Sequence, residues 1–232
     1  MISGATRLVG LIGNPVSGSL SPRMQNAAFA ARGLDWAYVP LLVQEDALEA
    51  AVRGLVALGF AGANVTIPYK TQVAALCDEA DGESVNTLVV EGGRVLGFNT
   101  DQEIVRGIVA EHVCLIGSGG AAKALLPALA GEVRIFSRRG AWPPDASGCD
   151  LVVSTTPVRD ELLVEPVAGQ TVVDLAYYPD GRQTALVEAA LAAGCDVVDG
   201  LEALVRQGAA SFERWTGVPA PVDVMRAAVR AA

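Results

Sequence analysis

Two lysines stand out because the chain otherwise carries its positive charge on arginine. Of the 17 basic residues, 15 are arginine and only Lys70 and Lys123 are lysine. Guanidinium stays protonated, so arginine cannot replace lysine where a side chain must give up a proton near neutral pH. Lys70 ends the run Asn64-Val65-Thr66-Ile67-Pro68-Tyr69-Lys70. This β-rich run and its proline predict an acid–base lysine at the mouth of a strand; the alternative is a solvated loop lysine.

A glycine-rich turn marks a second site. Gly117, Gly119 and Ala122 match the dinucleotide fingerprint G-x-G-x-x-A, between a predicted strand at 113–116 and a predicted helix at 121–129. Gly117 makes the tight turn, and Gly119 lets the backbone approach a pyrophosphate. Ala122 permits close packing of helix on strand. We expect the pyrophosphate on the backbone N–H groups at the helix N-terminus.

The end of the next strand discriminates between the two nicotinamide cofactors. An NAD site carries an acidic residue there, which binds the ribose 2′-OH. This chain carries Ser137-Arg138-Arg139 instead. Two guanidinium groups and a hydroxyl suit the 2′-phosphate of NADP by charge and by bidentate geometry. The sequence therefore predicts NADP; the alternative is a solvated charge pair at a strand end.

Hydride transfer also requires a group that gives or takes a proton. The single histidine, His112, precedes the fingerprint strand, at the end opposite to the expected cofactor, so we do not expect it to be the base. Asp101 follows a predicted hairpin and is the candidate partner of Lys70, with a surface ion pair of little worth as the alternative. Short polar groups expected at strand ends suit a polyhydroxylated substrate: Ser17, Ser19, Asn64, Thr66 and Asn86.

Hydrophobic periodicity and turn residues predict α/β architecture in two parts. The first part alternates strands and helices and then adds a hairpin, which gives a mostly parallel mixed sheet. Its predicted strands are 8–12, 36–43, 62–67, 88–90 and 95–98, and its helices are 24–32, 45–58 and 70–78. Ser21 and Pro22 are the expected N-cap and first residue of the first helix.

The second part starts with a linking helix at 102–110. Its predicted strands are 113–116, 133–136, 151–154, 171–174 and 196–198, with a helix at 186–193 before the last strand and helices 201–215 and 222–231 at the end.

Composition limits the partners. The net charge of -9 and a pI near 4.6 argue against nucleic acid or an anionic membrane as the main partner. The four cysteines are scattered without C-x-x-C pairing, which predicts reduced core thiols of a cytoplasmic protein and no metal site. No apolar run approaches the roughly 18 residues of a membrane helix.

These motifs, taken together and in order, resemble the shikimate dehydrogenase family. The resemblance covers nearly the whole chain. It rests on Gly13-Asn14-Pro15-Val16-Ser17-x-Ser19-x-Ser21-Pro22, the run ending at Lys70, Val85-Asn86-Thr87-Leu88, Asn99-Thr100-Asp101, Gly117-Ser118-Gly119-Gly120-Ala121-Ala122, Asp199-Gly200-Leu201 and Leu204-Val205-Arg206-Gln207-Gly208-Ala209.

The resemblance implies a substrate-binding domain at 1–101, completed by a C-terminal helix at 217–232. A Rossmann NADP-binding domain would span 102–216, with linking helices at 102–110 and 201–216 and an active-site cleft between the domains. The implied reaction is the reversible, NADP-dependent oxidation of shikimate to 3-dehydroshikimate, in aromatic amino acid biosynthesis.

The resemblance also assigns roles to residues. Lys70 would be the acid–base residue and Asp101 its partner. Ser17 and Ser19 would hold the substrate carboxylate, and Thr66, Asn86, Tyr177 and Gln207 would contact the ring hydroxyls or the carboxylate. NADP would bind at Gly117, Ser118, Gly119, Gly120, Ala121, Ser137, Arg138 and Arg139. The partner would be a small shikimate-like hydroxy acid, and the protein a monomer or homodimer.

The chain departs from the family pattern in places. Gly18 and Gln25 stand where histidines are usual, and Gln102 stands where a glycine usually follows the catalytic aspartate. Glu202-Ala203 replaces a Gly-Met pair near the nicotinamide, and the region after Arg139 is short. A quinate or aminoshikimate dehydrogenase, or a non-catalytic relative that binds the ligand or cofactor, are the alternatives.

Overall fold

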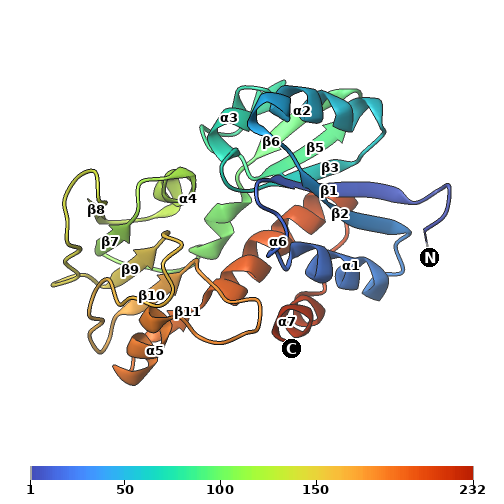
Figure 1. The fold of residues 1–232 in the computed structure, drawn as a ribbon. Helices are drawn as coiled ribbons and strands as arrows, with labels where there is room; N and C mark the ends of the chain where they lie inside the picture. The colour runs from blue at the N-terminus through green and yellow to red at the C-terminus, as the bar shows by residue number, and fades with distance from the viewer. Residues whose placement is uncertain (1, 232) are drawn as a thin grey trace. The chain divides into compact units, whose positions relative to one another are not determined.

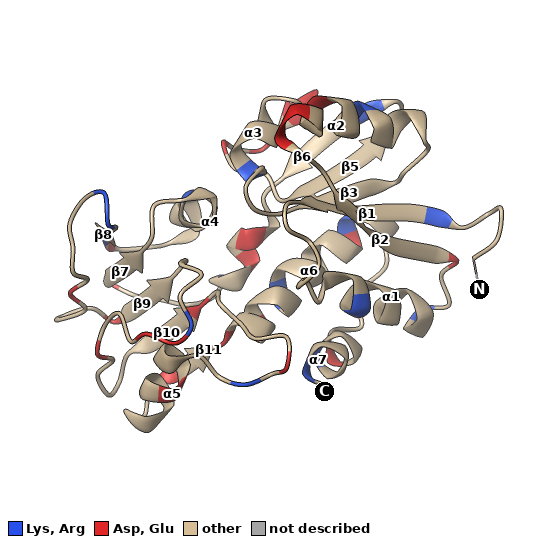
Figure 2. Cartoon of the chain, in the orientation of Figure 1, with Lys and Arg blue, Asp and Glu red and all other residues tan. Residues whose placement is uncertain are grey.

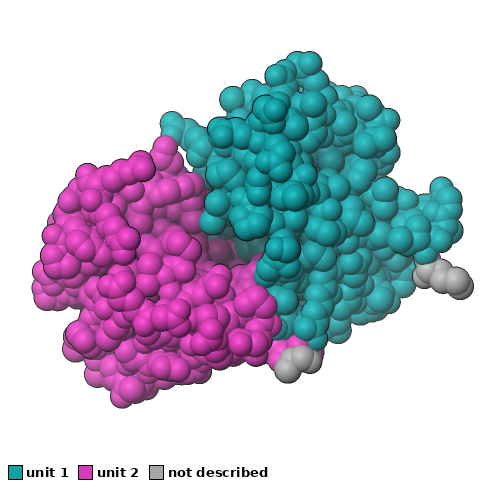
Figure 3. All heavy atoms as spheres, in the orientation of Figure 1, with its two compact units in different colours: residues 1–101, 205–229 teal, residues 102–204, 230–232 magenta. Residues whose placement is uncertain are grey.

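The computed structural model describes residues 2–231 and divides into two compact units (Figures 1 and 3). Unit 1 comprises Met1–Asp101 with Val205–Val229, and unit 2 comprises Gln102–Leu204 with Arg230–Ala232. The domain boundary expected from the sequence lies at 216, so the two divisions differ over 205–216 and 230–232. The segment 205–216 belongs to the helix Gly200–Thr216 and packs with unit 1.

Unit 1 is built on a six-stranded mixed sheet in the order β2-β1-β3-β5-β6-β4. Three parallel strands alternate with helices, and an antiparallel hairpin follows them. Gly92 and Gly93 form the hairpin turn with φ of 58° and 78°, conformations that glycine adopts without steric cost. The strands are β1 (Arg7–Gly13), β2 (Trp36–Leu42), β3 (Gly62–Val65), β4 (Glu79–Ala80), β5 (Thr87–Glu91) and β6 (Arg94–Phe98).

Helices cover both faces of this sheet (Figure 1). On one face, α2 (Leu48–Ala57) and α3 (Lys70–Ala74) bury Leu55 and Val73 against Leu88 of β5. On the other face lie α1 (Ser21–Ala31), α6 (Gly200–Thr216) and α7 (Val222–Arg230). There the rings of Phe29 and Phe212 stack at 5.4 Å.

Unit 2 is built on a five-stranded parallel sheet in the order β11-β10-β9-β7-β8. In the Rossmann order 3-2-1-4-5-6 these strands take places 6, 5, 4, 1 and 2, so the described residues of unit 2 lack the third strand. The strands are β7 (His112–Ile116), β8 (Glu132–Phe136), β9 (Leu151–Ser154), β10 (Thr171–Asp174) and β11 (Asp196–Val198).

Alternating residues of β7 serve two separate cores. Leu115 packs with Leu125 of α4 (Gly120–Leu125), whereas Ile116 packs with Leu186 of α5 (Ala185–Ala192). This period of two is what a strand buried on both faces requires. No helix lies between β8 and β9 in the described chain, in keeping with the short region expected after Arg139.

Local structure differs from the sequence-based expectations at several points. The helix predicted at 121–129 ends at Leu125 and continues as a 3-10 turn, η3 (Leu126–Ala128), because Pro127 cannot donate an α-helical hydrogen bond. The linking helix predicted at 102–110 is wrong: only η2 (Thr100–Ile104) forms, and Gly107 has a φ of 80°.

The third difference lies at the start of α1. Leu20 is the N-cap, without a side-chain hydrogen bond, and Ser21 is the buried first residue of the helix. The helix expected at 45–58 also begins one turn later than predicted, after η1 (Glu45–Ala47).

Within residues 2–231, no helix is long and apolar enough to cross a membrane. The four cysteines are free thiols, and three of them are buried.

Candidate active site

The topology of unit 1 brings its polar motifs to one edge of the sheet. β1 and β3 are parallel and adjacent, with Ile12 opposite Val65, so the loops that follow them leave at the same edge. β5 runs antiparallel to β3, and β6 runs antiparallel to β5. The start of β5 and the end of β6 therefore reach this edge as well. Lys70 follows the end of β3, Asn86 precedes the start of β5, and Asp101 follows the end of β6.

Close packing holds the first two loops together. A Cβ atom at Gly13 would lie 2.4 Å from Cγ2 of Thr66, so only glycine fits there. The main-chain N–H of Asn14 donates to the carbonyl of Ile67 at 3.0 Å. The glycine of the first motif thus sets the position of the second motif, which ends at Lys70.

Lys70 and Asp101 form a largely buried ion pair. Nζ of Lys70 donates to Oδ2 of Asp101 at 2.6 Å, and their side chains are 15% and 6% exposed. Lys70 is the first residue of α3, and Asp101 lies in η2 directly after β6. Removing one partner of such a pair leaves the other charge poorly solvated. The two residues therefore form a buried ion pair and not the exposed surface pair that was the alternative.

Asn86 holds the second oxygen of the carboxylate. Its Nδ2 donates to Oδ1 of Asp101 at 2.8 Å and lies 3.4 Å from Oε1 of Gln207 on α6. Asn86 is 2% exposed. Three of the residues expected in the site, Lys70, Asn86 and Asp101, are thus linked directly, and Gln207 lies beside them.

The remaining expected substrate contacts of unit 1 line the loops of the same edge. Ser17 is exposed in the turn after β1, and Ser19 is half-buried, where its Oγ accepts from the N–H of Ser21 at 3.2 Å. Thr66 is half-buried and its N–H donates to Ile12. Gln25, which stands at a position where histidine is usual, is fully buried and donates to the carbonyl of Gly208 at 2.9 Å.

In unit 2 the glycine turn lies at the point where the strand order reverses. Gly117 follows β7 with a φ of 120°, and a Cβ there would lie 2.2 Å from Oγ1 of Thr155, the residue after β9. At Gly119, by contrast, a Cβ would meet nothing within 4 Å, so the space in front of this backbone is open. Ligands of open α/β sheets bind at such a switch point, outside the carboxyl ends of the strands.

The loop after β8 presents its two arginines to solvent, where Figure 2 shows a positive segment. The loop is closed by hydrogen bonds from Gly140 N–H to Ser137 and from Ser137 N–H to Ala141, at 2.9 and 3.0 Å. The guanidinium carbon of Arg138 lies 5.7 Å from the centre of the Trp142 ring. No carboxylate ends this strand, so the residues present fit a 2′-phosphate better than a free ribose hydroxyl.

Tyr177 belongs to unit 2, in the loop after β10, and its contact with a substrate stays a prediction. The last residue of β10, Asp174, is 1% exposed and accepts from Oγ1 of Thr184 at 2.6 Å and from the N–H of Ala176 at 3.1 Å. Burial raises the pKa of Asp174 to about 6, although these hydrogen bonds oppose the rise.

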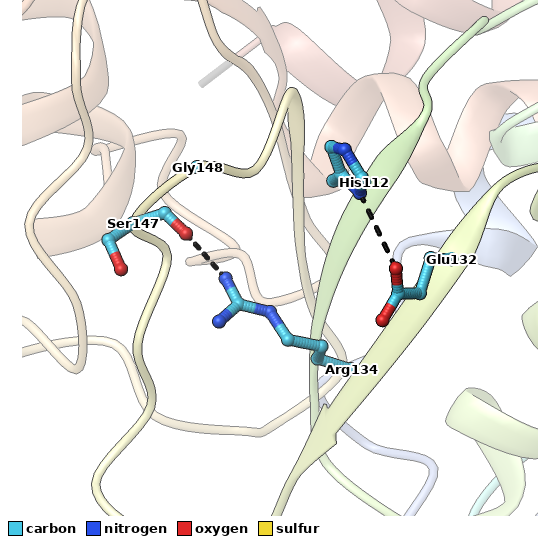
Figure 4. A pocket seen from close by; sticks show the side chains of 5 residues that line it. All are labelled: His112, Glu132, Arg134, Ser147 and Gly148. Atoms are coloured by element: carbon cyan, nitrogen blue, oxygen red, sulfur yellow. Dashed lines mark hydrogen bonds and ion pairs between the residues drawn. The ribbon is translucent and has the colours of Figure 1, made fainter.

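His112 lies at the opposite edge of the unit 2 sheet, as expected from the sequence. It begins β7 and, with Glu132, Arg134, Ser147 and Gly148, lines a pocket of about 220 Å³ (Figure 4). Nδ1 of His112 is 3.8 Å from a carboxylate oxygen of Glu132, and Arg134 donates to the carbonyl of Ser147 at 2.6 Å. Because the glycine turn follows the other end of β7, His112 takes no part in that site.

Comparison with known proteins agrees with this geometry. Residues 11–88 match a family model described as the shikimate dehydrogenase substrate binding domain, and residues 200–230 match the shikimate 5'-dehydrogenase C-terminal domain. A shikimate dehydrogenase (NADP(+)) of Rubrobacter xylanophilus is 41% identical, with 98% of this chain and 97% of that protein aligned. The chain belongs to the shikimate dehydrogenase family.

Other members of the family are similar over the full length. A shikimate dehydrogenase (NADP(+)) of an Anaeromyxobacter species is 40% identical, covering 100% of this chain and 98% of that protein. The solved shikimate 5-dehydrogenase of Thermus thermophilus, in complex with NADP(H) and shikimate, superposes with a TM-score of 0.85 at 29% identity, over 97% and 98% of the two chains. The alignment with the Rubrobacter protein spans 280 positions, more than the 232 residues present here, so it contains gaps in this chain.

The sequence did not point to a group of buried hydroxyls behind the site. Thr87, Thr100 and Ser211 are each at most 2% exposed and bond to one another. Thr87 and Thr100 belong to motifs that were read for their neighbours, whereas Ser211 lies in no motif and on a helix far along the chain, so nothing in the sequence indicated that the three hydroxyls meet.

Proposed function

We propose that the protein catalyses the reversible, NADP-dependent oxidation of shikimate to 3-dehydroshikimate. The observation that carries the proposal is the buried pair of Lys70 and Asp101, 2.6 Å apart, in a chain of the shikimate dehydrogenase family. A lysine in this setting is an amine held at one point and able to exchange a proton, which is what oxidation of an alcohol requires. The step belongs to aromatic amino acid biosynthesis, and the free thiols suit a cytoplasmic enzyme.

Lys70 takes the proton of the reacting hydroxyl in the oxidation direction. As the C–H bond of the alcohol carbon breaks and its hydride leaves, the O–H proton passes to Nζ of Lys70, which releases one proton to water in each cycle. Asp101 holds Nζ through Oδ2, while Asn86 holds Oδ1. Because the carboxylate is fixed at both oxygens, the amine is held in one place without reorganisation during the reaction.

Short hydroxyl and amide groups hold the substrate. Ser17 and Ser19 bind its carboxylate from the loop after β1, and Thr66 and Asn86 bind its ring hydroxyls. Tyr177 and Gln207 complete the set. Support comes from the shared sheet edge and from the 3.4 Å approach of Asn86 and Gln207. Groups of this kind recognise a polyhydroxylated acid by hydrogen bonds to each oxygen.

Unit 2 binds NADP. The open space at Gly119 admits a pyrophosphate to the backbone of Gly117, Ser118, Gly119, Gly120 and Ala121, and Ser137, Arg138 and Arg139 hold the 2′-phosphate. The cofactor supplies the acceptor of the hydride when it is bound. All other steps fall to residues of the protein.

Quinate is the second candidate substrate. A quinate dehydrogenase of Corynebacterium glutamicum in complex with NAD superposes with a TM-score of 0.82 at 25% identity, over 98% and 99% of the two chains. Quinate carries one more hydroxyl than shikimate on a saturated ring carbon. The arginines after β8 favour NADP and thus the shikimate reaction. Initial rates with each substrate and each nucleotide test the proposal, and a higher kcat/KM for quinate with NAD would contradict it.

A further inference from the structure

Three buried hydroxyls meet behind the ion pair. Oγ1 of Thr87 lies 2.8 Å from Oγ of Ser211 and 3.0 Å from Oγ1 of Thr100, and the last two atoms are 3.1 Å apart. We call these three residues the hydroxyl cluster. They come from β5, α6 and η2, respectively, and their exposure is 0%, 0% and 2%. The cluster therefore ties the start of the hairpin, its end and the helix of Gln207 to one point.

The side-chain amide of Asn64 orients the cluster. Its Nδ2 donates to the main-chain carbonyl of Asn86 at 3.0 Å, an atom that can only accept. This contact fixes which end of the Asn64 amide carries the N–H groups. The same Nδ2 lies 3.0 Å from Oγ1 of Thr87 and 2.9 Å from Oγ of Ser211, and Tyr38 donates its hydroxyl to Oδ1 of Asn64. The cluster therefore accepts hydrogen bonds from Asn64 in a defined direction.

Asn86 contacts the cluster through its side-chain oxygen. Its Oδ1 accepts from the main-chain N–H of Thr100 at 2.8 Å, an atom that can only donate. Oγ1 of Thr100 and Oγ1 of Thr87 lie 3.1 and 3.2 Å from the same Oδ1. With its oxygen held there, the Asn86 side chain must turn Nδ2 towards Oδ1 of Asp101.

The protons of the network can all be accommodated. Ser211 donates to the carbonyl of Gln207 at 3.0 Å, and Thr100 donates to Oδ1 of Asn86. Thr87 donates to the same Oδ1 of Asn86 at 3.2 Å and accepts from Nδ2 of Asn64. No atom of the cluster remains without a partner. A buried network in which every group has a partner is rigid, and removing a hydroxyl from it takes a hydrogen-bond partner from the groups that remain.

We propose that Thr87 and Ser211 are positioning residues of the reaction: the hydroxyl of Ser211 holds that of Thr87, Thr87 holds the Asn86 amide, and Asn86 in turn holds the carboxylate of Asp101 and thus the amine of Lys70. The proposal rests on the proposed function for its effect on turnover. It does not rest on it for the orientation of Asn86, which is a property of the folded protein alone. Ser211 acts in addition on Gln207, whose carbonyl it bonds.

Two pairs of variants separate positioning from mere stability. Thr87→Val removes the hydroxyl and keeps the shape, whereas Thr87→Ser keeps the hydroxyl and loses a methyl group. Ser211→Ala is matched by Thr216→Val on the same helix. Thr216 makes the equivalent bond to the carbonyl four residues earlier, at 2.8 Å to Phe212, and its hydroxyl does not bond to the cluster. Both pairs are assayed well below their melting temperatures.

The first readout is turnover of shikimate with NADP by the full chain. We expect Thr87→Val and Ser211→Ala to lower kcat by about 10- to 100-fold with an unchanged KM for NADP, because a small misplacement of a catalytic group has that effect. Thr87→Ser and Thr216→Val should stay within about two-fold of the wild type. Equal kcat in all four variants, or an equal loss in Thr87→Ser and Thr87→Val, would overturn the role in catalysis.

The second readout needs no turnover. The side-chain amide resonances of Asn86, assigned by their loss in Asn86→Asp, should shift in Thr87→Val and Ser211→Ala and stay in place in Thr216→Val. If the wild type oxidises no shikimate, the proposed function fails, and these resonances alone decide whether the cluster orients Asn86. Unmoved resonances in both cluster variants would overturn the inference, whether or not the wild type is active.

Discussion

Nζ of Lys70 lies 2.6 Å from Oδ2 of Asp101, although 31 residues separate them in the chain. The hairpin β5–β6 brings them together, because it returns the chain to the edge at which β3 ends. We expect Lys70→Ala to lower kcat by about 10²- to 10⁴-fold, the usual contribution of a positioned acid–base group. Initial rates of NADPH formation at saturating shikimate measure this.

Lys70→Arg is the matched control for charge. Guanidinium can still pair with Asp101 but does not give up its proton. We therefore expect Lys70→Arg to be as impaired as Lys70→Ala. Activity near that of the wild type in Lys70→Arg would show that only a positive charge is needed at this position.

Asp101→Asn tests the carboxylate. An amide at this position would turn an N–H group towards a donor, either Nζ of Lys70 or Nδ2 of Asn86, so one of the two contacts must break. We expect kcat to fall by about 10²-fold or more. Glu103→Gln, two residues away and paired with exposed Arg106, is the control and should retain its kcat. Equal rates for the two variants would argue against a role for Asp101.

The two glycines of the turn should fail in different ways. In Gly117→Ala the new methyl group would meet Oγ1 of Thr155, at a φ of 120° that alanine rarely adopts, so the melting temperature should fall. Gly119→Ala has open space and should keep its melting temperature, while KM for NADP rises because the methyl group obstructs the pyrophosphate. Thermal melts and NADP titrations of both variants measure this, and an unchanged KM in Gly119→Ala would contradict the cofactor assignment.

Arg138→Ala combined with Arg139→Ala should remove the preference for NADP. Two charge-assisted hydrogen bonds to a 2′-phosphate, each worth about 1.5–3 kcal/mol, predict a KM for NADP at least about 10-fold higher. KM for NAD should change little, because NAD lacks this phosphate. Arg106→Ala, an exposed arginine of the same unit, serves as the control. Parallel losses with both nucleotides would place the arginines outside the cofactor site.

The buried carboxyl of Asp174 should give unit 2 a pH-dependent stability. Its pKa is raised from 3.8 to about 6 by burial, so between these pH values the folded state keeps a proton that the unfolded state has lost. Stability then falls as pH rises from about 4 to 6 and levels off above 6. Asp174→Asn removes this dependence.

The difference in free energy of unfolding between the wild type and Asp174→Asn should therefore change by up to about 3 kcal/mol over this range. Chemical denaturation at several pH values measures it. Parallel curves for the two proteins would mean that folding leaves the pKa of Asp174 unchanged.

Most of the fold could be predicted from local patterns. The strands at 151–154, 171–174 and 196–198 have the bounds that their apolar runs predict. Gly33 and Gly59, both with positive φ, follow the ends of α1 and α2. The failures have local causes too. Pro127 cut the helix of the glycine turn short, and Gly107 ended a linking helix that apolar spacing had favoured.

The site was predictable where a motif carries the residue, as with Lys70, Asn86 and Asp101. The hydroxyl cluster was not, because Ser211, which meets Thr87 across 124 residues, lies in no motif. Only the register of β3 with β5 and the packing of α6 bring them together. Such convergences belong to the tertiary structure and leave no trace in spacing.

The most direct test of the account is a set of initial rates for the purified protein, with shikimate or quinate as substrate and NADP or NAD as nucleotide. The account predicts the highest kcat/KM for shikimate with NADP, and loss of that activity in both Lys70→Ala and Lys70→Arg. No reduction of either nucleotide by the wild type, or full activity in Lys70→Arg, would contradict it.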